Sequence, residues 1–364
     1  MDNLEKDFSY KLHSILSSNK IEHLFNNIKT KIEYYELDNK LILSTVTDEV
    51  FENNCYVVSP NGMIINYSKV ELHKIKNFVL IFLMRMVINL FSSFLSFFKI
   101  DKIQILNNYM LSTNFFSDYW KSIDIDLLTK MAVKRYPNHV LAIRSINKNQ
   151  NNEILTVLLR NGWVQVVTRQ VYLFPNFDFK KRDIVRDLAL LKSEKYIFVA
   201  PDIDNCEHFK AAQILYNKLY LQKYTEENIQ YTALYMQKLC KENLLHLRLL
   251  LDVERDKFVA VIGLIGDSKT VTAPIVGYET DMPTDNALYR RCLIYSIKYA
   301  HDNNLFLNMS SGAPSFKLNR GATPEVEFML INIKHLSLAR RLLWLTLSKI
   351  SLYIYKPILQ KYKL

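Results

Sequence analysis

The densest group of residues that could do chemistry lies in the stretch LNMSSGAPSFKLNRGATPEVEF, residues 307–328. A predicted strand ends there in a turn at residues 310–312, and the backbone amides of such a turn can hold an anion. Lys317 and Arg320 stand three residues apart, which places both positive charges on one side of a turn or short helix. Gly321 lets the backbone approach its neighbour closely. The spacing fits an anion-binding site, and it fits equally a tight turn with solvated charges.

Two more groups of polar residues precede that stretch. Glu279 and Tyr278 end a predicted strand, where a glutamate can act as a general base or simply lie exposed to solvent. Arg290 and Arg291 fall in the first turn of a predicted helix, where positive charge opposes the helix dipole. Because that placement is unfavourable for the helix, it suggests that the guanidinium groups recognise a phosphate or a carboxylate. Tyr289 and Tyr278 are candidate walls of the same pocket.

No metal site is predicted from the cysteines and histidines. The four cysteines are far apart and form no CxxC pair, and the histidines stand in no ligand or nucleophile–base pattern. The same cysteine usage favours a reducing compartment. The N-terminus MDNLEKDFSY has acidic residues where a secretory signal has a basic start and an apolar core, so we expect no export signal and a cytoplasmic protein.

The composition limits the kind of scaffold that can position these groups. The chain has 364 residues, of which 49% are hydrophobic and 12% aromatic, with 47 basic against 36 acidic side chains. This composition excludes a disordered chain and suits roughly two folded domains. The chain has seven glycines where average usage gives about 25, and five of them follow residue 260. The last third of the chain is therefore the first place to look for a site that depends on backbone geometry.

Hydrophobic periodicity predicts two successive α/β units. In the first unit we expect strands at 40–46, 54–60, 101–114 (leading into a loop), 139–147 and 163–174, a turn at Asn61-Gly62, and helices at 77–98, 125–136 and 151–162. In the second we expect helices at 208–224, 228–243 and 287–304, an antiparallel meander at 246–280, strands at 305–311 and 325–333, and a loop at 312–317. The domains would then span residues 1–178 and 205–335, joined by a connector at 179–204 and followed by a helix at 336–364.

Two stretches could touch a membrane. Residues 77–98 form a long apolar helix whose polar groups, beginning at Arg85, share one narrow stripe. It could be a core helix whose stripe lines a cleft, an in-plane membrane helix or a true span. Residues 328–364 contain seven basic side chains and no Asp or Glu, with leucines between the bases. The basic amphipathic helix at 336–364 fits an anionic membrane surface, an acidic partner such as a carrier protein, or packing on the domain, and nucleic acid is a weaker candidate.

Two stretches of the sequence resemble a known family. Residues 287–328 resemble the last third of the GNAT acetyltransferase fold in its FemAB/CelD-like branch, where a helix and a strand lead to a Gly, a Phe-Lys turn and an Arg-Gly pair. Residues 134–174 are similar to the closing half of a GNAT domain. The matching positions are Ser311, Gly312, Phe316, Lys317, Arg320 and Gly321 in the later stretch, and Gly162, Trp163, Arg169 and Tyr172 in the earlier one.

The resemblance implies both a fold and a reaction. The fold would be α/β (α+β), with two tandem GNAT-like domains, each a mixed, mainly antiparallel sheet flanked by helices. The reaction would be N-acyl transfer from a thioester, acyl-CoA or acyl-carrier protein, to an amine, with no tightly bound cofactor. The chain shows no clear Arg/Gln-x-x-Gly-x-Gly/Ala pyrophosphate loop and no coiled-coil insertion of the kind found in tRNA-using members.

Two alternatives stay open beside N-acyl transfer. One is a FemAB-type transferase that uses aminoacyl-tRNA, and the other is a GNAT-fold module without catalysis that binds a membrane or a partner. A lipid-like or amino-acid-like acceptor would suit attachment to the inner face of a membrane. The catalytic candidates are Glu279 and Tyr278, and the candidates for binding donor or acceptor are Ser310, Ser311, Gly312, Phe316, Lys317, Arg320, Gly321, Tyr289 and Arg290.

Overall fold

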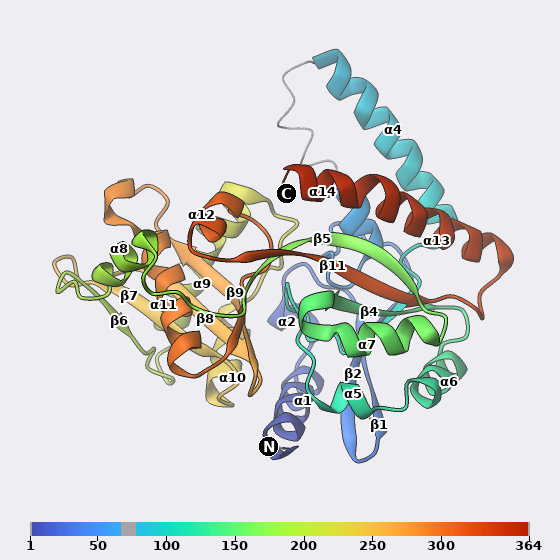
Figure 1. Ribbon diagram of the computed structural model, residues 1–364, viewed down its shortest axis with the longest axis horizontal. Coiled ribbons are helices and arrows are strands. Elements are labelled where there is room, and N and C mark those ends of the chain that lie inside the picture. Colours follow the sequence, from blue (N-terminus) through green and yellow to red (C-terminus); the bar gives the residue numbers. More distant parts are fainter. Residues whose placement is uncertain (1, 67–77, 363–364) are drawn as a thin grey trace.

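The computed structural model describes residues 2–66 and 78–362 and arranges them around one mixed sheet of eleven strands (Figure 1). The strands follow the order β1-β2-β3-β4-β11-β5-β10-β9-β8-β7-β6 across the sheet. Within the described chain, β3 with β4 and β10 with β9 pair in parallel, and the other neighbours pair antiparallel. The strands are β1 Lys31–Leu37, β2 Lys40–Thr47, β3 Ile103–Leu106, β4 Val140–Asn147, β5 Val164–Phe174, β6 Tyr196–Val199, β7 His246–Asp252, β8 Lys257–Gly266, β9 Thr270–Tyr278, β10 Phe306–Asn308 and β11 Thr323–Asn332.

Helices cover both faces of this sheet, and four hydrophobic clusters lie between them and the strands. The α-helices are α1 Asp2–Ser17, α2 Ile21–Leu24, α4 Phe78–Phe97, α5 Tyr119–Ser122, α6 Ile125–Arg135, α7 Lys148–Arg160, α8 Arg182–Leu190, α9 Cys206–Asn217, α10 Ala233–Lys241, α11 Leu288–Asp302, α12 Pro314–Asn319, α13 Leu338–Ile350 and α14 Lys356–Tyr362. Shorter helical turns are the π-helical η1 Gly62–Asn66, η3 Lys218–Tyr224 and η5 Ser351–Tyr355, and the 3-10 turn η4 Thr284–Asn286.

The two halves of the chain repeat one arrangement, as the sequence predicts. In the first half, β4 leads through α7 into β5, and in the second half β9 leads through α11 into β10. The alternation of apolar and polar residues in the sequence accounts for the formation of strand β5. Strand β4 is instead buried along its whole length, because helices pack on both of its faces. The order strand, helix, strand is therefore repeated in the structure as well as along the sequence.

The last strand joins the two halves. β11 lies between β4 and β5, so a strand from the end of the chain completes the sheet of the first half. β5 pairs with β11 along most of its length and then with β10 through Leu173 and Phe174. Figure 1 shows β5 and β11 running together through the middle of the molecule. The end of β5 is thus the place where both halves meet.

Three local predictions differ from the structure. Residues 54–60 form turns instead of a strand, because Asn54 bonds both to the backbone amide and to the backbone carbonyl of Lys29, while the amides of Val58 and Ser59 bond locally to Cys55. The predicted turn at Asn61-Gly62 is the start of η1, where Asp101 accepts the amide of residue 61. The predicted loop at residues 312–317 contains the start of α12, whose first position is a proline suited to a helix start.

The helix predicted at 77–98 corresponds to α4, and its first residue lies outside the described residues. Within the described part of the chain, no helix is long and apolar enough to cross a membrane. The C-terminal helix predicted at 336–364 comprises α13, η5 and α14, and Pro357 is tolerated because it falls in the first turn of α14. The segment 179–204 contains α8 and the edge strand β6.

Candidate functional site

Two β-bulges flank β11 where the halves of the molecule meet. On the β4 side, Arg144 and Ser145 together oppose the single residue Met329, and Ser145 has a φ of 65°. On the β5 side, Thr168 is the extra residue between two successive partners of β11. Bulges of this kind bend a strand locally and turn a side chain in a new direction, and they often occur beside functional sites. Arg144 and Arg169 stand at these two bulges, and both donate to the carbonyl of Ser112.

Arg169 is held by a buried carboxylate. Its Nε donates to Oε1 of Glu327 at 2.8 Å and its Nη2 lies 3.3 Å from Oε2, so the pair is bidentate. Glu327 is 2% exposed, and Arg169 also donates to the hydroxyl of Thr113 at 2.9 Å. The guanidinium is therefore fixed in one orientation at the centre of the molecule.

Arg144 is a second guanidinium at the same place, and it is buried, whereas Arg169 is partly exposed. Arg144 donates to the carbonyl of Val57 at 3.4 Å and to Oδ1 of Asn108 at 3.2 Å, and its guanidinium carbon lies 5.7 Å from the centre of the Tyr56 ring. Burial lowers the pKa of this guanidinium from its ordinary value. Its hydrogen bonds go to neutral oxygens, so the positive charge of Arg144 has no carboxylate bonded directly to it among the described contacts.

Lys317 extends from α12 into the interior. Its Nζ donates to the carbonyls of Met309 at 2.7 Å, Ser310 at 3.3 Å and Ser311 at 2.8 Å. The side chain is 3% exposed, and burial, with a smaller contribution from the nearby charge of Arg169, lowers the pKa of Lys317 to about 7. A lysine with this pKa can gain and lose a proton near neutrality.

We define the junction cluster as Arg144, Arg169, Lys317, Glu327 and Tyr172. Lys317 Nζ lies 5.4 Å from the centre of the Tyr172 ring, and the Tyr172 hydroxyl accepts from Gln170 at 3.0 Å. The cluster brings together three basic side chains and one carboxylate. An excess of buried positive charge is costly unless an anion or a developing negative charge enters it. The junction cluster is therefore our candidate functional site.

The predicted turn at residues 310–312 lies against this cluster. Gly312 has a φ of 82°, and a Cβ added there would meet no atom within 4 Å. The amide of Ser310 is taken by Asn308, whereas the carbonyls of Ser310 and Ser311 point to Lys317. The carbonyls of the turn thus face a cation, and its Ser310 amide is already bonded within the protein. Gly321, with a φ of 98°, follows α12 and approaches Lys181.

Aromatic residues predicted to line a pocket do lie together beside α12. The rings of Tyr278 and Tyr289 are 6.1 Å apart, and those of Tyr289 and Phe316 are 5.1 Å apart. Burial raises the pKa of the Tyr289 hydroxyl well above its ordinary value. The Tyr278 hydroxyl accepts from Lys223 at 3.0 Å. These rings form an aromatic wall next to the turn that carries Lys317.

The other predicted charges form separate ion pairs. Arg290 and Arg320 both bond to Asp187 of α8, at 2.8 Å and 2.7 Å through their Nε atoms. The Asp187 side chain is fully buried, and the Arg320 guanidinium also stacks on Phe316. Glu279 accepts from Lys218 at 2.7 Å and 2.8 Å. Arg290 and Arg320 therefore share one carboxylate, and Glu279 is paired with Lys218, so all three lie in ion pairs separate from the cluster.

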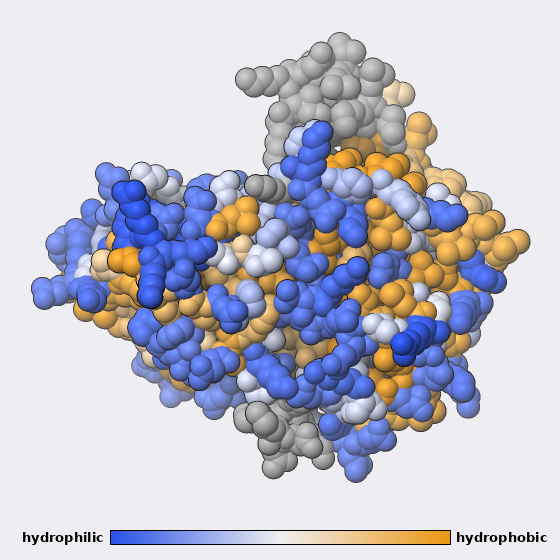
Figure 2. All heavy atoms as spheres, in the orientation of Figure 1, coloured by the Kyte–Doolittle hydropathy of each residue, from blue (hydrophilic) through white to orange (hydrophobic). Residues whose placement is uncertain are grey.

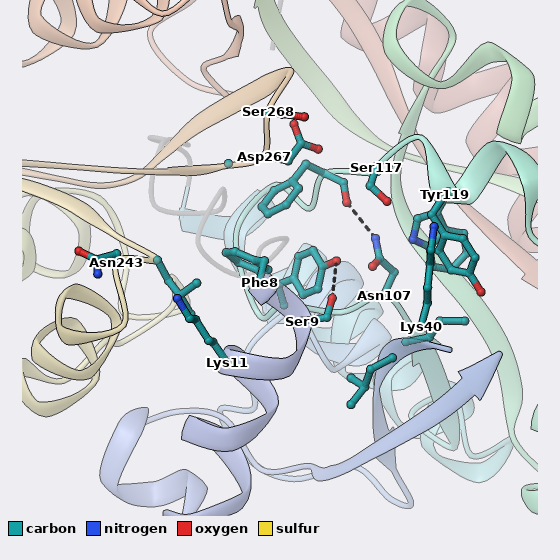
Figure 3. Close-up of a pocket in the computed structure, with 17 residues that line it drawn as sticks. Phe8, Ser9, Lys11, Lys40, Asn107, Ser117, Tyr119, Asn243, Asp267 and Ser268 are labelled. Carbon is teal, nitrogen blue, oxygen red and sulfur yellow. Dashed lines mark hydrogen bonds between the residues drawn. The ribbon is translucent and has the colours of Figure 1, made fainter. Parts of the chain in front are cut away.

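A distinct cavity of about 380 Å³ opens where α1 meets the β8–β9 turn (Figure 3). Its walls are aromatic, and Lys40 lies 4.1 Å from the ring centre of Tyr119. Two of its polar side chains are engaged inside the protein: Asn107 donates to the carbonyl of Phe115, and Ser9 bonds to the hydroxyl of Tyr109. The loop at residues 107–118 lies between this cavity and the junction cluster. Asn107 and Ser117 line the cavity, whereas Ser112 and Thr113 bond to Arg169.

Residues that the sequence did not single out as site residues complete the cluster. Arg169 and Tyr172 are marked only by the resemblance to GNAT domains, and Arg144 and Glu327 are not among the motif positions. Both sit inside strongly apolar strands, where a charged residue is rarely buried without a partner. A charge in the middle of a predicted core strand was the available clue.

Comparisons with known proteins identify the fold. No family model matches the chain, and no curated protein matches it in sequence. The structure resembles L-PGS from Bacillus licheniformis with a TM-score of 0.50 and 11% identity, over 94% of this chain and 96% of that one. It also matches FemX with a TM-score of 0.48 and 9% identity, over 84% of this chain and 88% of that one. A tandem GNAT protein from the clavulanic acid biosynthesis pathway matches with a TM-score of 0.34 and 10% identity, over 56% of this chain and 66% of that one. At 11% identity the likeness to L-PGS over nearly the full length of both chains shows a shared fold, and the mixed, mainly antiparallel sheet flanked by helices confirms the predicted fold class.

Proposed function

We propose that the protein is a FemAB-type transferase that moves an aminoacyl group from the ester of a charged tRNA to an amine, with the junction cluster as the reaction centre. The structure is acyltransferase-like in fold, and L-PGS aligns with it over nearly the full length of both chains. The observation that carries the proposal is the buried excess of positive charge at the meeting point of the two halves, where Lys317 has a pKa of about 7.

The chemistry of aminoacyl transfer suits these groups. The acceptor amine attacks the ester carbonyl, a C–N bond forms, the C–O bond to the tRNA ribose breaks, and the hydroxyl of the ribose leaves with a proton. Negative charge develops on the carbonyl oxygen, and the fixed guanidinium groups of Arg144 and Arg169 can stabilise it in a site with little water. In its neutral form, Lys317 can accept the proton of the attacking amine and pass it to the leaving ribose oxygen, because a base is most effective when its pKa is near the working pH.

Two helix starts argue for an ester on tRNA over a thioester on coenzyme A. The pyrophosphate of coenzyme A needs free backbone amides at the start of the helix that follows the central strand. At the start of α7, the side chain of Asn147 already accepts the amide of Gln150. Before α11, the loop at residues 279–287 contains Asp281 and Asp285, which would repel a pyrophosphate. Transfer from a thioester, which the sequence analysis favours, is therefore our second candidate reaction.

The test compares donors directly. The purified protein is incubated with a small amine acceptor and either a mixed pool of radiolabelled aminoacyl-tRNA or a panel of acyl-CoA thioesters. We expect acceptor-dependent loss of label from tRNA and no release of thiol from acyl-CoA. Lys317→Met should reduce transfer by about 100-fold or more, and the matched control Lys130→Met, at an exposed position on α6, should keep full activity. Consumption of acyl-CoA alone, or unchanged transfer in Lys317→Met, would contradict the proposal.

A further inference from the structure

Helix α4 exposes a row of large apolar side chains. Leu90 is 70% exposed and Phe97 is 80% exposed, although side chains of this kind are normally buried in a soluble protein. Figure 1 shows α4 lying at one end of the molecule, away from the central sheet. The exposed apolar residues on the helix are Phe82, Met86, Leu90, Phe91, Phe94 and Phe97.

The C-terminal helices expose a second set of apolar residues beside α4. Tyr353 is 78% exposed and Leu338 is 69% exposed. Tyrosine is the residue that most often stands where apolar lipid meets water, because its ring is apolar and its hydroxyl is polar. The exposed apolar residues of this segment are Leu338, Leu342, Ile350, Tyr353, Ile354, Tyr355, Ile358 and Tyr362.

The two sets form one surface, because α4 and α13 share a hydrophobic cluster. Leu95 of α4 packs in the same cluster as Leu343 and Trp344 of α13. Arg340 of α13 donates to the carbonyls of Lys99 and Lys102, which follow α4. Figure 2 shows hydrophobic residues gathered on the surface where α4 and α13 lie in Figure 1. We call the exposed apolar residues of both helical segments the apolar face.

The charges that α4 and the C-terminal segment themselves carry are all of one sign. The sequence has no Asp or Glu at 78–100 or at 328–364. Arg85 on α4 and Arg341, Lys349 and Lys361 on the C-terminal segment are exposed. An anionic bilayer complements this face in two ways. Its apolar interior can receive the apolar side chains, and its negative headgroups can pair with the basic ones.

We propose that the apolar face is an in-plane docking surface for an anionic lipid bilayer, into which α4 and the α13–α14 segment insert their aromatic and aliphatic side chains while the basic groups contact the headgroups. A second copy of the chain fits poorly, because a two-fold contact would place the same unpaired positive charges against each other. The inference stands on this surface alone, and it holds whichever acyl donor the junction cluster uses.

The experiment is co-sedimentation of the full-length protein with extruded vesicles. Vesicles of phosphatidylcholine with about one third phosphatidylglycerol should bind the protein, and pure phosphatidylcholine should bind it far more weakly, with the difference shrinking in high salt. The double variant Leu90→Ser/Phe97→Ser removes apolar contact, and Arg341→Glu/Lys349→Glu reverses two charges. Each should weaken partitioning to anionic vesicles by about tenfold or more.

Matched controls separate the surface from general effects. Val185→Ser/Ile214→Ser removes two apolar side chains that are 52% and 55% exposed in the second half, and Lys130→Glu/Lys134→Glu reverses two exposed charges on α6. Both should bind vesicles like the unaltered protein. Thermal unfolding checks that every variant is folded, and aminoacyl transfer to a soluble amine without vesicles should be unchanged in all four.

Three results would overturn the proposal. The first is an absence of binding to anionic vesicles. The second is equal binding by the surface variants and the controls. The third is a dimer in light scattering that Leu90→Ser/Phe97→Ser dissociates, since a second copy would then cover the face. Loss of transfer in the soluble assay concerns the proposed function and leaves the vesicle result standing.

Discussion

Two groups of charged side chains lie near each other around α12, and they differ in the partners to which their cations bond. Around Asp187, a fully buried carboxylate receives Arg290 and Arg320, and both guanidinium groups point to its oxygens. In the junction cluster, Glu327 neutralises Arg169, while Arg144 and Lys317 bond to neutral carbonyl and amide oxygens. The first group bonds both of its guanidinium groups to one carboxylate and ties α8, α11 and α12 together, whereas in the second group the described hydrogen bonds of Arg144 and Lys317 reach no carboxylate.

The difference teaches how to separate a structural ion pair from a reaction centre. Burial alone does not distinguish them, because Asp187 and Lys317 are both almost inaccessible to solvent. The distinguishing signs are the pKa of Lys317, lowered to about 7, and the two bulges that place Arg144 and Arg169 beside β11. Changes in the Asp187 group should therefore affect stability, and changes in the junction cluster should affect turnover.

The largest effect is expected from Asp187→Ala. Removing this carboxylate leaves Arg290 and Arg320 buried without their partner, and breaking a buried pair in this way typically costs about 3–5 kcal/mol. Urea unfolding followed by circular dichroism should show this loss. Asp183→Ala on the same helix is the control, because its partner Arg186 is largely exposed, and it should cost less than about 1 kcal/mol. Equal losses in the two variants would contradict a structural role for Asp187.

The next effect is on turnover, from Arg169→Lys. A lysine keeps the charge but cannot make the bidentate bond to Glu327, so transfer should fall by about 100-fold. Arg320→Lys should instead lower the unfolding free energy and leave the turnover of the folded enzyme within about threefold of normal. Steady-state kinetics and unfolding on the same samples measure both quantities. A turnover loss in Arg320→Lys as large as in Arg169→Lys would remove the distinction between the two groups.

A smaller effect is expected in the dependence of stability on pH. Because the pKa of Lys317 is about 7 in the folded protein, the folded state binds fewer protons than the unfolded state above that pH. Stability from this group should therefore rise between about pH 7 and pH 10, where the unfolded lysine still holds its proton. Lys317→Met should lose this rise, which urea unfolding at pH 7 and pH 9 can detect. Parallel changes in the two proteins would mean that Lys317 is not the group responsible.

The smallest effect is expected from Gly312→Ala. The position has a φ of 82° and open space around it, so alanine costs only its backbone conformation, about 1 kcal/mol. The carbonyls of Ser310 and Ser311 would still reach Lys317, and turnover should stay within about threefold of normal. A thermal melt and a transfer assay decide this. A large loss of turnover would show that the turn contacts substrate.

The repeated strand and helix order could be predicted from the sequence because each element has its own periodicity. The position of β11 could not, since its pairing with β4 and β5 joins residues far apart in the chain. Lys317 stood out through its motif, but its burial and its carbonyl partners depend on how α12 folds back on β10. Arg144 and Arg169 both reach the carbonyl of Ser112 from strands whose register is shifted by bulges, and no local pattern in a single sequence encodes such a shift.

The place of β11 also fixes an order of events during synthesis. When the ribosome has completed β5, the strand that will lie between β4 and β5 does not yet exist, so both strands present open edges. At ordinary rates of translation this state lasts on the order of ten seconds or more, until Asn332 has emerged. A nascent chain in this state is exposed to aggregation, and a message truncated anywhere before β11 yields a first half that cannot close its sheet.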